Sequence, residues 1–194
     1  MDVESRAIRA LSFLHDAGAF AACVPGAKPC AVVDIGAGQE SPRKVIKRMG
    51  LNVKYLPVDY KARSEETIVC NLNNIEFPHA QLENYNVVAF LALGSLEYVI
   101  HRWALVASLA MYPNAVTIIH YQFGKGRSAK DFAWVSPLLP EHFSVLVAPF
   151  NGAFYPDALA ELHVSKNLPS YGAITCAEDN AAECMAQLVA TGLV

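Results

Sequence analysis

The segment Ala31-Val32-Val33-Asp34-Ile35-Gly36-Ala37-Gly38-Gln39 carries the strongest structural signal in this chain. A short apolar run leads to an acid, turns through two glycines and continues into signals for the start of a helix. Ser41 can cap that helix, Pro42 suits its first turn, and Gly50 supplies a stop signal at its end. The pattern therefore predicts a strand at about 31–35, a glycine turn and a helix.

A second acidic residue follows the glycine turn at a sequence spacing typical of nucleoside-binding folds. The run Lys54-Tyr55-Leu56-Pro57-Val58-Asp59 ends on Asp59, about twenty residues past the turn. Strand, glycine turn, helix, strand and acid form the layout of a Rossmann-type half that holds a nucleoside. The glycines let the backbone approach the ligand, and Asp59 can accept hydrogen bonds from both ribose hydroxyls. The alternative is an ordinary tight turn in an α/β core.

The residues after the turn indicate which nucleoside is held. A dinucleotide fingerprint has a third glycine where Ser41 stands, and the neighbouring Glu40 would repel a pyrophosphate at the helix N-terminus. S-adenosylmethionine has no phosphate and carries a cationic sulfonium. We therefore favour the methyl donor over NAD or FAD, and expect Glu40 to tolerate it better than its neutral product, S-adenosylhomocysteine.

Over about residues 28–150 the chain resembles the class I S-adenosylmethionine-dependent methyltransferases. The segment Val33 to Gly38 is similar to their glycine-rich first motif, and Val58-Asp59 to the acidic end of their second strand. Residues 67–73 are similar to the third strand, whose end flanks the adenine. Residues 87–97 are similar to the fourth strand and the turn beyond it.

This resemblance implies S-adenosylmethionine as cofactor and a Rossmann-like three-layer α/β sandwich, with a mostly parallel sheet and a C-terminal antiparallel edge. The residues it assigns to cofactor binding are Asp34, Gly36, Ala37, Gly38, Asp59, Tyr60, Asn71, Leu72, Leu93 and Gly94. Two positions depart from the family pattern. Glu40 replaces a glycine that many members carry. Asn71 replaces an aspartate that faces the adenine amino group, although its amide oxygen can accept the same hydrogen bond.

The candidate catalytic residues come from a general property of open α/β sheets, in which ligands bind at the carboxyl ends of the strands. This rule selects residues 94–97 and 120–122. Methyl transfer to oxygen or nitrogen often needs a base to remove a proton from the acceptor. His120 and His101 are the candidate bases; the alternative is that each is an ordinary polar residue at a strand end or on a helix surface.

Length and composition predict a single domain over residues 1–194, with a leading helical segment at 1–28, a core at 29–165 and a tail at 166–194. Hydrophobic residues make up 54% of the chain and charged residues 17%, which argues against disorder. The net charge of −3 provides no electrostatic footprint for nucleic acid, and the longest apolar run is too short to span a bilayer. We therefore expect neither a nucleic acid nor a membrane as partner.

The cysteines predict the redox environment. Five cysteines are scattered without CxxC or metal-ligand spacing, at positions Cys23, Cys30, Cys70, Cys176 and Cys184. This arrangement predicts reduced, mostly buried thiols and no metal site. The acidic N-terminus lacks the order of a signal peptide, so the expected location is cytoplasmic.

The remaining periodicity places further elements. A leading helix, or two short ones, is expected within 3–22, and strands at 54–58, 67–70, 86–92, 116–121 and 143–150, the last paired antiparallel with 161–165. A helix capped by Ser95 is expected to place Leu96, Val99, Ile100, Trp103, Val106, Ala107 and Ala110 on one face. Only a turn is expected at 77–85, a loop or basic lid at 124–128, a tight turn at 151–152 and helix at 178–189.

The leading interpretation is a cytosolic methyltransferase-like domain that acts on a small molecule or a glycan precursor. A catalytically inactive binding or scaffold protein of the same fold is the first alternative, and an NAD(P)-dependent reductase is the second. The sequence leaves a homo-oligomer open.

Overall fold

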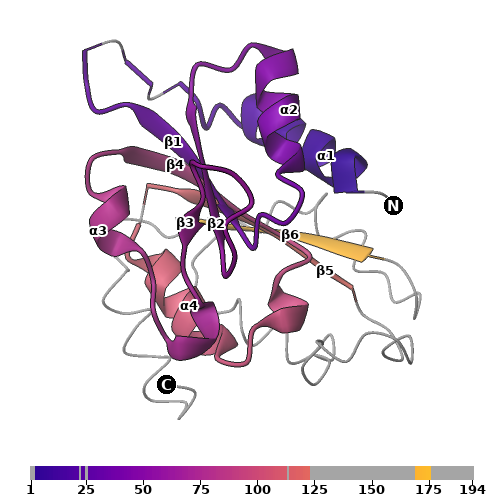
Figure 1. The fold of residues 1–194 in the computed structure, drawn as a ribbon. Coiled ribbons are helices and arrows are strands. Elements are labelled where there is room, and N and C mark those ends of the chain that lie inside the picture. Colours follow the sequence, from indigo (N-terminus) through magenta and orange to yellow (C-terminus); the bar gives the residue numbers. More distant parts are fainter. Residues whose placement is uncertain (1–2, 22, 25, 113, 123–168, 176–194) are drawn as a thin grey trace.

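The computed structural model describes residues 3–21, 23–24, 26–112, 114–122 and 169–175 (Figure 1). Its elements in chain order are α1 (Val3–Asp16), β1 (Cys30–Ile35), α2 (Ser41–Met49), β2 (Lys54–Asp59), β3 (Ile68–Val69), the 3₁₀ helix η1 (Leu72–Asn74), α3 (His79–Leu82), β4 (Asn86–Leu93), the 3₁₀ helix η2 (Leu96–Tyr98), α4 (Arg102–Ala110), β5 (Val116–Gln122) and β6 (Pro169–Thr175).

The sheet has the order β3-β2-β1-β4-β5-β6, and its first five strands are parallel. The chain runs from β1 outward to β2 and β3, and then crosses back to β4 and β5 on the other side of β1. The strand order therefore reverses between β1 and β4, and the carboxyl ends beside this switch point are where open sheets bind ligands. β6 lies next to β5 with antiparallel register. The edge strands predicted at 143–150 and 161–165 lie outside the described residues.

Helices cover both faces of the sheet. α1 and α2 lie on one face, and α3 and α4 lie on the other (Figure 1). Successive β1 side chains alternate between the two layers: Val32 packs in one buried cluster with Leu11 of α1, and Val33 packs in the other with Leu105 of α4. The predicted Rossmann-like α/β arrangement with a mostly parallel sheet is confirmed.

The helix after the glycine turn begins as predicted, except for its cap. Pro42 lies in the first turn, and the N–H of Gly50 closes the helix by donating to Ile46 O and Lys47 O. The cap residue is Glu40 and not Ser41, so the predicted cap was wrong. Glu40 adopts the left-handed conformation (φ 52°), and its carbonyl already accepts a hydrogen bond from Arg43 N, which makes Ser41 the first helical residue.

The segment after β4 differs more from the prediction. Ser95 makes no capping hydrogen bond with its side chain, and a single 3₁₀ turn precedes α4, which begins only at Arg102. The side chain of Asn73 explains the break, because its Nδ2 donates to Tyr98 O (3.1 Å) and its Oδ1 accepts from Ile100 N (2.7 Å). These bonds take backbone groups that a continuous helix would use. Ile100, expected on the buried face, is 59% exposed.

Three other boundaries were predicted only approximately. Residues 77–85, expected to form only a turn, contain the one-turn helix α3. The third strand is shorter than expected, since β3 comprises only Ile68–Val69. The leading helix ends at Asp16. The segments predicted at 124–128, 151–152 and 178–189 lie outside the described residues.

A disulfide joins Cys23 to Cys30, so the prediction of reduced thiols was wrong for this pair. The chain after α1 folds back to the start of β1 and brings the two Cα atoms to 5.6 Å, a separation that suits a disulfide. Cys70 is a buried free thiol, as predicted. Cys176 and Cys184 lie outside the described residues. Across the part of the chain that the structure describes, no helix is long and apolar enough to cross a bilayer.

Candidate cofactor-binding site

The two glycines of the turn after β1 have different surroundings. Both adopt the left-handed conformation, Gly36 at φ 69° and Gly38 at φ 51°. A Cβ added to Gly36 would lie 2.5 Å from Ser95 Cβ, whereas a Cβ on Gly38 would have Gly36 O, at 3.8 Å, as its nearest neighbour. Gly36 is therefore required for the turn to pack against the end of β4. Gly38 leaves room on the side where a ligand would approach.

The glycine turn is bonded to the end of β2. The N–H groups of Gly36 and Ala37 donate to Val58 O at 2.8 and 3.0 Å. The N–H of Gly38 donates to Asp59 Oδ2 at 2.9 Å. The two motifs that the sequence placed about twenty residues apart therefore form one unit at the carboxyl edge of the sheet.

The Asp59 carboxylate is only 4% exposed and is held by its own loop as well. Its Oδ1 accepts a hydrogen bond from Lys61 N at 3.1 Å and pairs with the Arg63 guanidinium at 3.3 Å. A carboxylate offers about four acceptor positions. The N–H groups of Gly38 and Lys61 fix the orientation of the Asp59 carboxylate. Ligand hydroxyl groups could compete with Arg63 for its Oδ1.

Asp34 is a residue of β1 and is 3% exposed. Its Oδ2 accepts a hydrogen bond from Tyr55 Oη at 2.5 Å. Burial raises the pKa of Asp34 to about 7; the Tyr55 hydrogen bond opposes this shift, and the negative charges of Glu40 and Asp59 add to it. Burial beside Asp34 also raises the pKa of Tyr55. In this structure the carboxyl group of Asp34 links β1 to Tyr55 of β2, and its assignment to cofactor binding stays a prediction.

The side chain of Glu40 is fully engaged by protein groups. Its Oε2 accepts hydrogen bonds from Arg43 Nε at 2.8 Å and Nη2 at 2.7 Å. Its Oε1 accepts from Ser64 Oγ at 2.8 Å and Thr67 Oγ1 at 3.2 Å. The carboxylate that was expected to face the ligand is instead neutralised by α2 and bonded to the loop between β2 and β3.

Three more residues assigned to cofactor binding, Tyr60, Asn71 and Leu72, follow the ends of β2 and β3, which are neighbouring parallel strands. Tyr60 is 58% exposed, with Lys61 Nζ 5.0 Å from the centre of its ring. Leu72 is partly buried. Asn71 is exposed, and its Oδ1 accepts a hydrogen bond from Asn73 N at 3.1 Å, which caps η1. The second lone pair of that oxygen remains an acceptor toward solvent.

Arg6 of α1 reaches the end of β4, which the sequence did not indicate. Its Nη1 donates to Leu93 O at 2.9 Å and lies so close to Gly94 that any side chain there would collide with it. Its buried Nε finds no acceptor among the residues described. The Oγ of Ser95, which is 7% exposed, likewise has no partner in the described part of the chain. Two buried donors therefore lie beside the switch point.

The two candidate bases occupy different environments. His120 is 3% exposed, pairs in register with Leu93, and accepts the N–H of Gly94 on its backbone oxygen at 3.0 Å. Burial, together with the positive charge of Arg6, lowers the pKa of His120 to about 3. His120 is therefore a neutral imidazole at physiological pH. His101 is exposed at the N-terminus of α4 and makes no capping bond.

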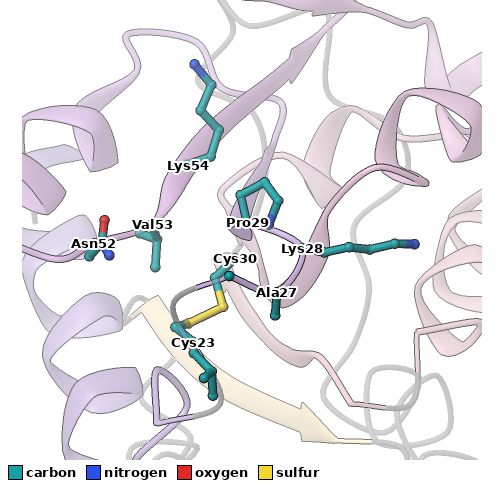
Figure 2. Close-up of a pocket in the computed structure, with 10 residues that line it drawn as sticks. Cys23, Ala27, Lys28, Pro29, Cys30, Asn52, Val53 and Lys54 are labelled. Atoms are coloured by element: carbon teal, nitrogen blue, oxygen red, sulfur yellow. A yellow bond between two sulfur atoms is a disulfide. The ribbon is translucent and has the colours of Figure 1, made fainter.

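One cavity of about 420 Å³ lies at the opposite edge of the sheet. Figure 2 shows the Cys23–Cys30 disulfide among its lining residues, which also include Lys28 and Lys54. Cys30 and Lys54 are the first residues of β1 and β2, so this cavity opens at the amino ends of the strands. It is separate from the glycine turn.

Among known proteins, similarity to this chain is found with solved structures. No protein-family profile matches the chain, and no curated protein matches it. The plantazolicin methyltransferase BamL, solved with a triazolic desmethylPZN analog and SAH, is similar with a TM-score of 0.53 and 17% identity, over 75% of this chain and 61% of that one. The mitomycin 7-O-methyltransferase MmcR is similar with a TM-score of 0.51 and 13% identity, over 88% of this chain and 56% of that one.

The chain thus spans less than two thirds of the length of these two neighbours. At such low identity the likeness concerns the fold. Together with the glycine turn and the acid at the end of β2, it shows that this chain has the fold of the class I S-adenosylmethionine-dependent methyltransferases.

Proposed function

We propose that this chain binds S-adenosylmethionine at the carboxyl ends of β1 to β4 and transfers its methyl group to a small molecule or a glycan precursor. The observation that carries the proposal is the hydrogen bond from Gly38 N to Asp59 Oδ2, at 2.9 Å. It joins the turn, at a position without a side chain, to the acid that can accept ribose hydroxyls. The similar fold of BamL, solved with SAH, supports the same placement.

The residues present fit such a cofactor. Asp59 would hold the ribose, Tyr60, Asn71 and Leu72 would surround the adenine, and the amino-acid end would lie near Gly36, Ala37, Leu93 and Gly94. Ser95 Oγ and Arg6 Nε, both buried without partners in the described residues, are donors that a polar ligand group would satisfy. When bound, S-adenosylmethionine supplies an electrophilic methyl group on a cationic sulfonium.

Ribose hydroxyls would reach Asp59 by replacing its pair with Arg63. The Arg63 side chain is 36% exposed and 3.3 Å from Asp59 Oδ1, so this ion pair is partly solvated. Partly solvated ion pairs contribute about 1 kcal/mol or less to stability, so replacing this one costs little. The hydrogen bonds from Gly38 N and Lys61 N would stay in place and keep the carboxylate oriented.

A neutral His120 can accept a proton, and we propose it, or the exposed His101, as the base that removes the proton of the acceptor. The same observation favours a second function. A buried imidazole whose pKa is about 3 is a weak base, which suits a protein that binds the cofactor without catalysis. Substitution of His120 by glutamine separates the two: loss of methyl transfer at unchanged cofactor affinity supports catalysis by this residue.

Several finer predictions belong to the same proposal. They are the antiparallel C-terminal edge formed by 143–150 and 161–165, the single domain over residues 1–194, the absence of a nucleic acid partner, the homo-oligomer left open and the cytoplasmic location. The Cys23–Cys30 disulfide weighs against the cytoplasmic location, because cytosolic thiols are kept reduced.

Calorimetric titration tests the function. The wild type should bind S-adenosylmethionine and S-adenosylhomocysteine and not NAD. Asp59→Ala should weaken both by about 1.5–3 kcal/mol, the cost of losing hydrogen bonds to a charged group. The matched control is Asp16→Ala, which removes an exposed acid whose described partner is the neighbouring His15. If Asp59→Ala stays folded and binds as the wild type does, the assignment is wrong.

A further inference from the structure

Glu40 occupies a backbone conformation that favours glycine. Its φ of 52° and ψ of 36° lie in the left-handed region, which residues with a Cβ adopt at a cost. Its side chain makes no capping hydrogen bond to the backbone N–H groups of α2. The backbone thus follows the path that a glycine would take, while a buried carboxylate is added to the turn.

That carboxylate connects two segments that are distant in sequence. On α2 it binds Arg43 through two hydrogen bonds, and on the β2–β3 loop (residues 60–67) it binds Ser64 Oγ and Thr67 Oγ1. Arg43 reinforces the link, since its Nη2 donates to Ser64 Oγ at 3.2 Å and its Nη1 pairs with Glu66. The loop is therefore held from the helix side by an ion pair and two hydroxyl groups.

The same loop holds the Asp59 carboxylate. Thr67 Oγ1 accepts hydrogen bonds from Arg63 N at 3.0 Å and Ser64 N at 2.9 Å, which fixes the path of the loop. The loop supplies Lys61 N and the Arg63 guanidinium to Asp59. Hydrogen bonds thus lead from Glu40 through Thr67 to the backbone of Arg63, and the ion pair of Arg63 completes the connection to Asp59.

We propose that Glu40 is a positioning residue that fixes the β2–β3 loop and thereby orients the Asp59 carboxylate for ribose. The proposal rests on the proposed function, because it assigns Asp59 to the cofactor. It replaces the expectation that Glu40 discriminates the cationic donor from its neutral product. A carboxylate that is paired with Arg43 and bonded to two hydroxyl groups acts on the loop and not on the ligand. The affinities for S-adenosylmethionine and S-adenosylhomocysteine should therefore depend on it equally.

The test compares Glu40→Gly and Glu40→Gln with the wild type. Glu40→Gly removes the carboxylate and relieves the backbone, so the variant should fold. It should weaken S-adenosylmethionine and S-adenosylhomocysteine by the same factor, about tenfold, the order of one lost hydrogen bond. Glu40→Gln keeps bonds to the loop hydroxyls and should lose less. The control Glu4→Gln removes an exposed carboxylate that pairs with Arg48, and should bind as the wild type does.

Hydrogen exchange provides a readout without any ligand. The amides of Arg63 and Ser64, which donate to Thr67 Oγ1, should exchange faster in Glu40→Gly, and amides of the β1 and β4 core should not. Loosening of the whole protein, or an unchanged loop, would overturn the proposal. So would a change in affinity confined to S-adenosylmethionine, because it would show that the charge acts on the ligand directly.

A double-mutant cycle separates positioning from a general structural effect. If Glu40 acts through Asp59, adding Glu40→Gly to Asp59→Ala should change S-adenosylhomocysteine affinity by less than about twofold. Additive losses would overturn the proposal while leaving the function intact. A wild type that binds neither nucleoside would instead overturn the function, and the proposal with it. The two failures are therefore distinguishable.

Discussion

Replacing Gly36 by alanine should destabilise the protein more than the same change at Gly50, another left-handed glycine. Gly36 has φ 69°, and its added Cβ would lie 2.5 Å from Ser95 Cβ, a distance that real side chains do not tolerate. Gly50 has nearly the same φ, 65°, but a Cβ there would meet no atom within 4 Å. The two positions therefore share the backbone penalty and differ in packing.

The magnitudes follow from these two contributions. The left-handed conformation costs alanine about 1–2 kcal/mol, which is the whole expected effect at Gly50. At Gly36 an overpacking cost of about 1–3 kcal/mol is added, because the neighbouring atom belongs to a short side chain that cannot swing away. We expect Gly36→Ala to lower the free energy of unfolding by about 2–5 kcal/mol in total.

Urea unfolding followed by circular dichroism measures both variants. The midpoint should fall for each, with unchanged slope, and more for Gly36→Ala. Adding Ser95→Gly removes the atom that collides and should recover the overpacking contribution, so the two substitutions should be non-additive. Equal destabilisation at Gly36 and Gly50, or no recovery with Ser95→Gly, would refute the packing argument for the turn.

Two further predictions concern ionisation. Burial raises the pKa of Asp34 from its ordinary 3.8 to about 7, so the unfolded chain ionises first and the free energy of unfolding should fall between about pH 4 and pH 7, by up to about 4 kcal/mol. Asp34→Asn should remove this fall. If the urea midpoints of the wild type and of Asp34→Asn depended on pH in the same way, the prediction would be wrong. Burial lowers the pKa of His120 to about 3, so its imidazole NMR signals should not titrate between about pH 5 and pH 8; a midpoint near 6.5, the ordinary value, would show that it is accessible to water.

The elements around the glycine turn were predictable because their signals are local. Pro42 and Gly50 delimit α2, and apolar runs mark β1, β2 and β4. The placement of Asp59 beside Gly38 also follows from the sequence, since parallel strands that are consecutive in a Rossmann half end at the same edge. The part of the candidate site that lies at the carboxyl ends of β1 and β2 could therefore be predicted from the sequence.

Contacts between distant residues were not predictable in this way. The start of α4 depends on the Asn73 side chain, which bonds the backbone of Tyr98 and Ile100 and outweighs the apolar periodicity of that segment. Arg6 reaches Leu93 O across 87 residues of sequence. The Cys23–Cys30 pairing depends on the path of the chain after α1, which cysteine spacing does not reveal.

Glu40 shows how a departure from a family pattern can be misjudged from sequence. A carboxylate in place of glycine suggested a charge facing the ligand. The left-handed φ of 52° shows that the backbone keeps the path available to glycine, and Arg43, Ser64 and Thr67 account for the carboxylate. The strain of one residue is offset by four hydrogen bonds from these partners. The substitution is therefore no argument against cofactor binding, because it alters what the turn holds on its outer side while the glycine at position 38 still faces Asp59.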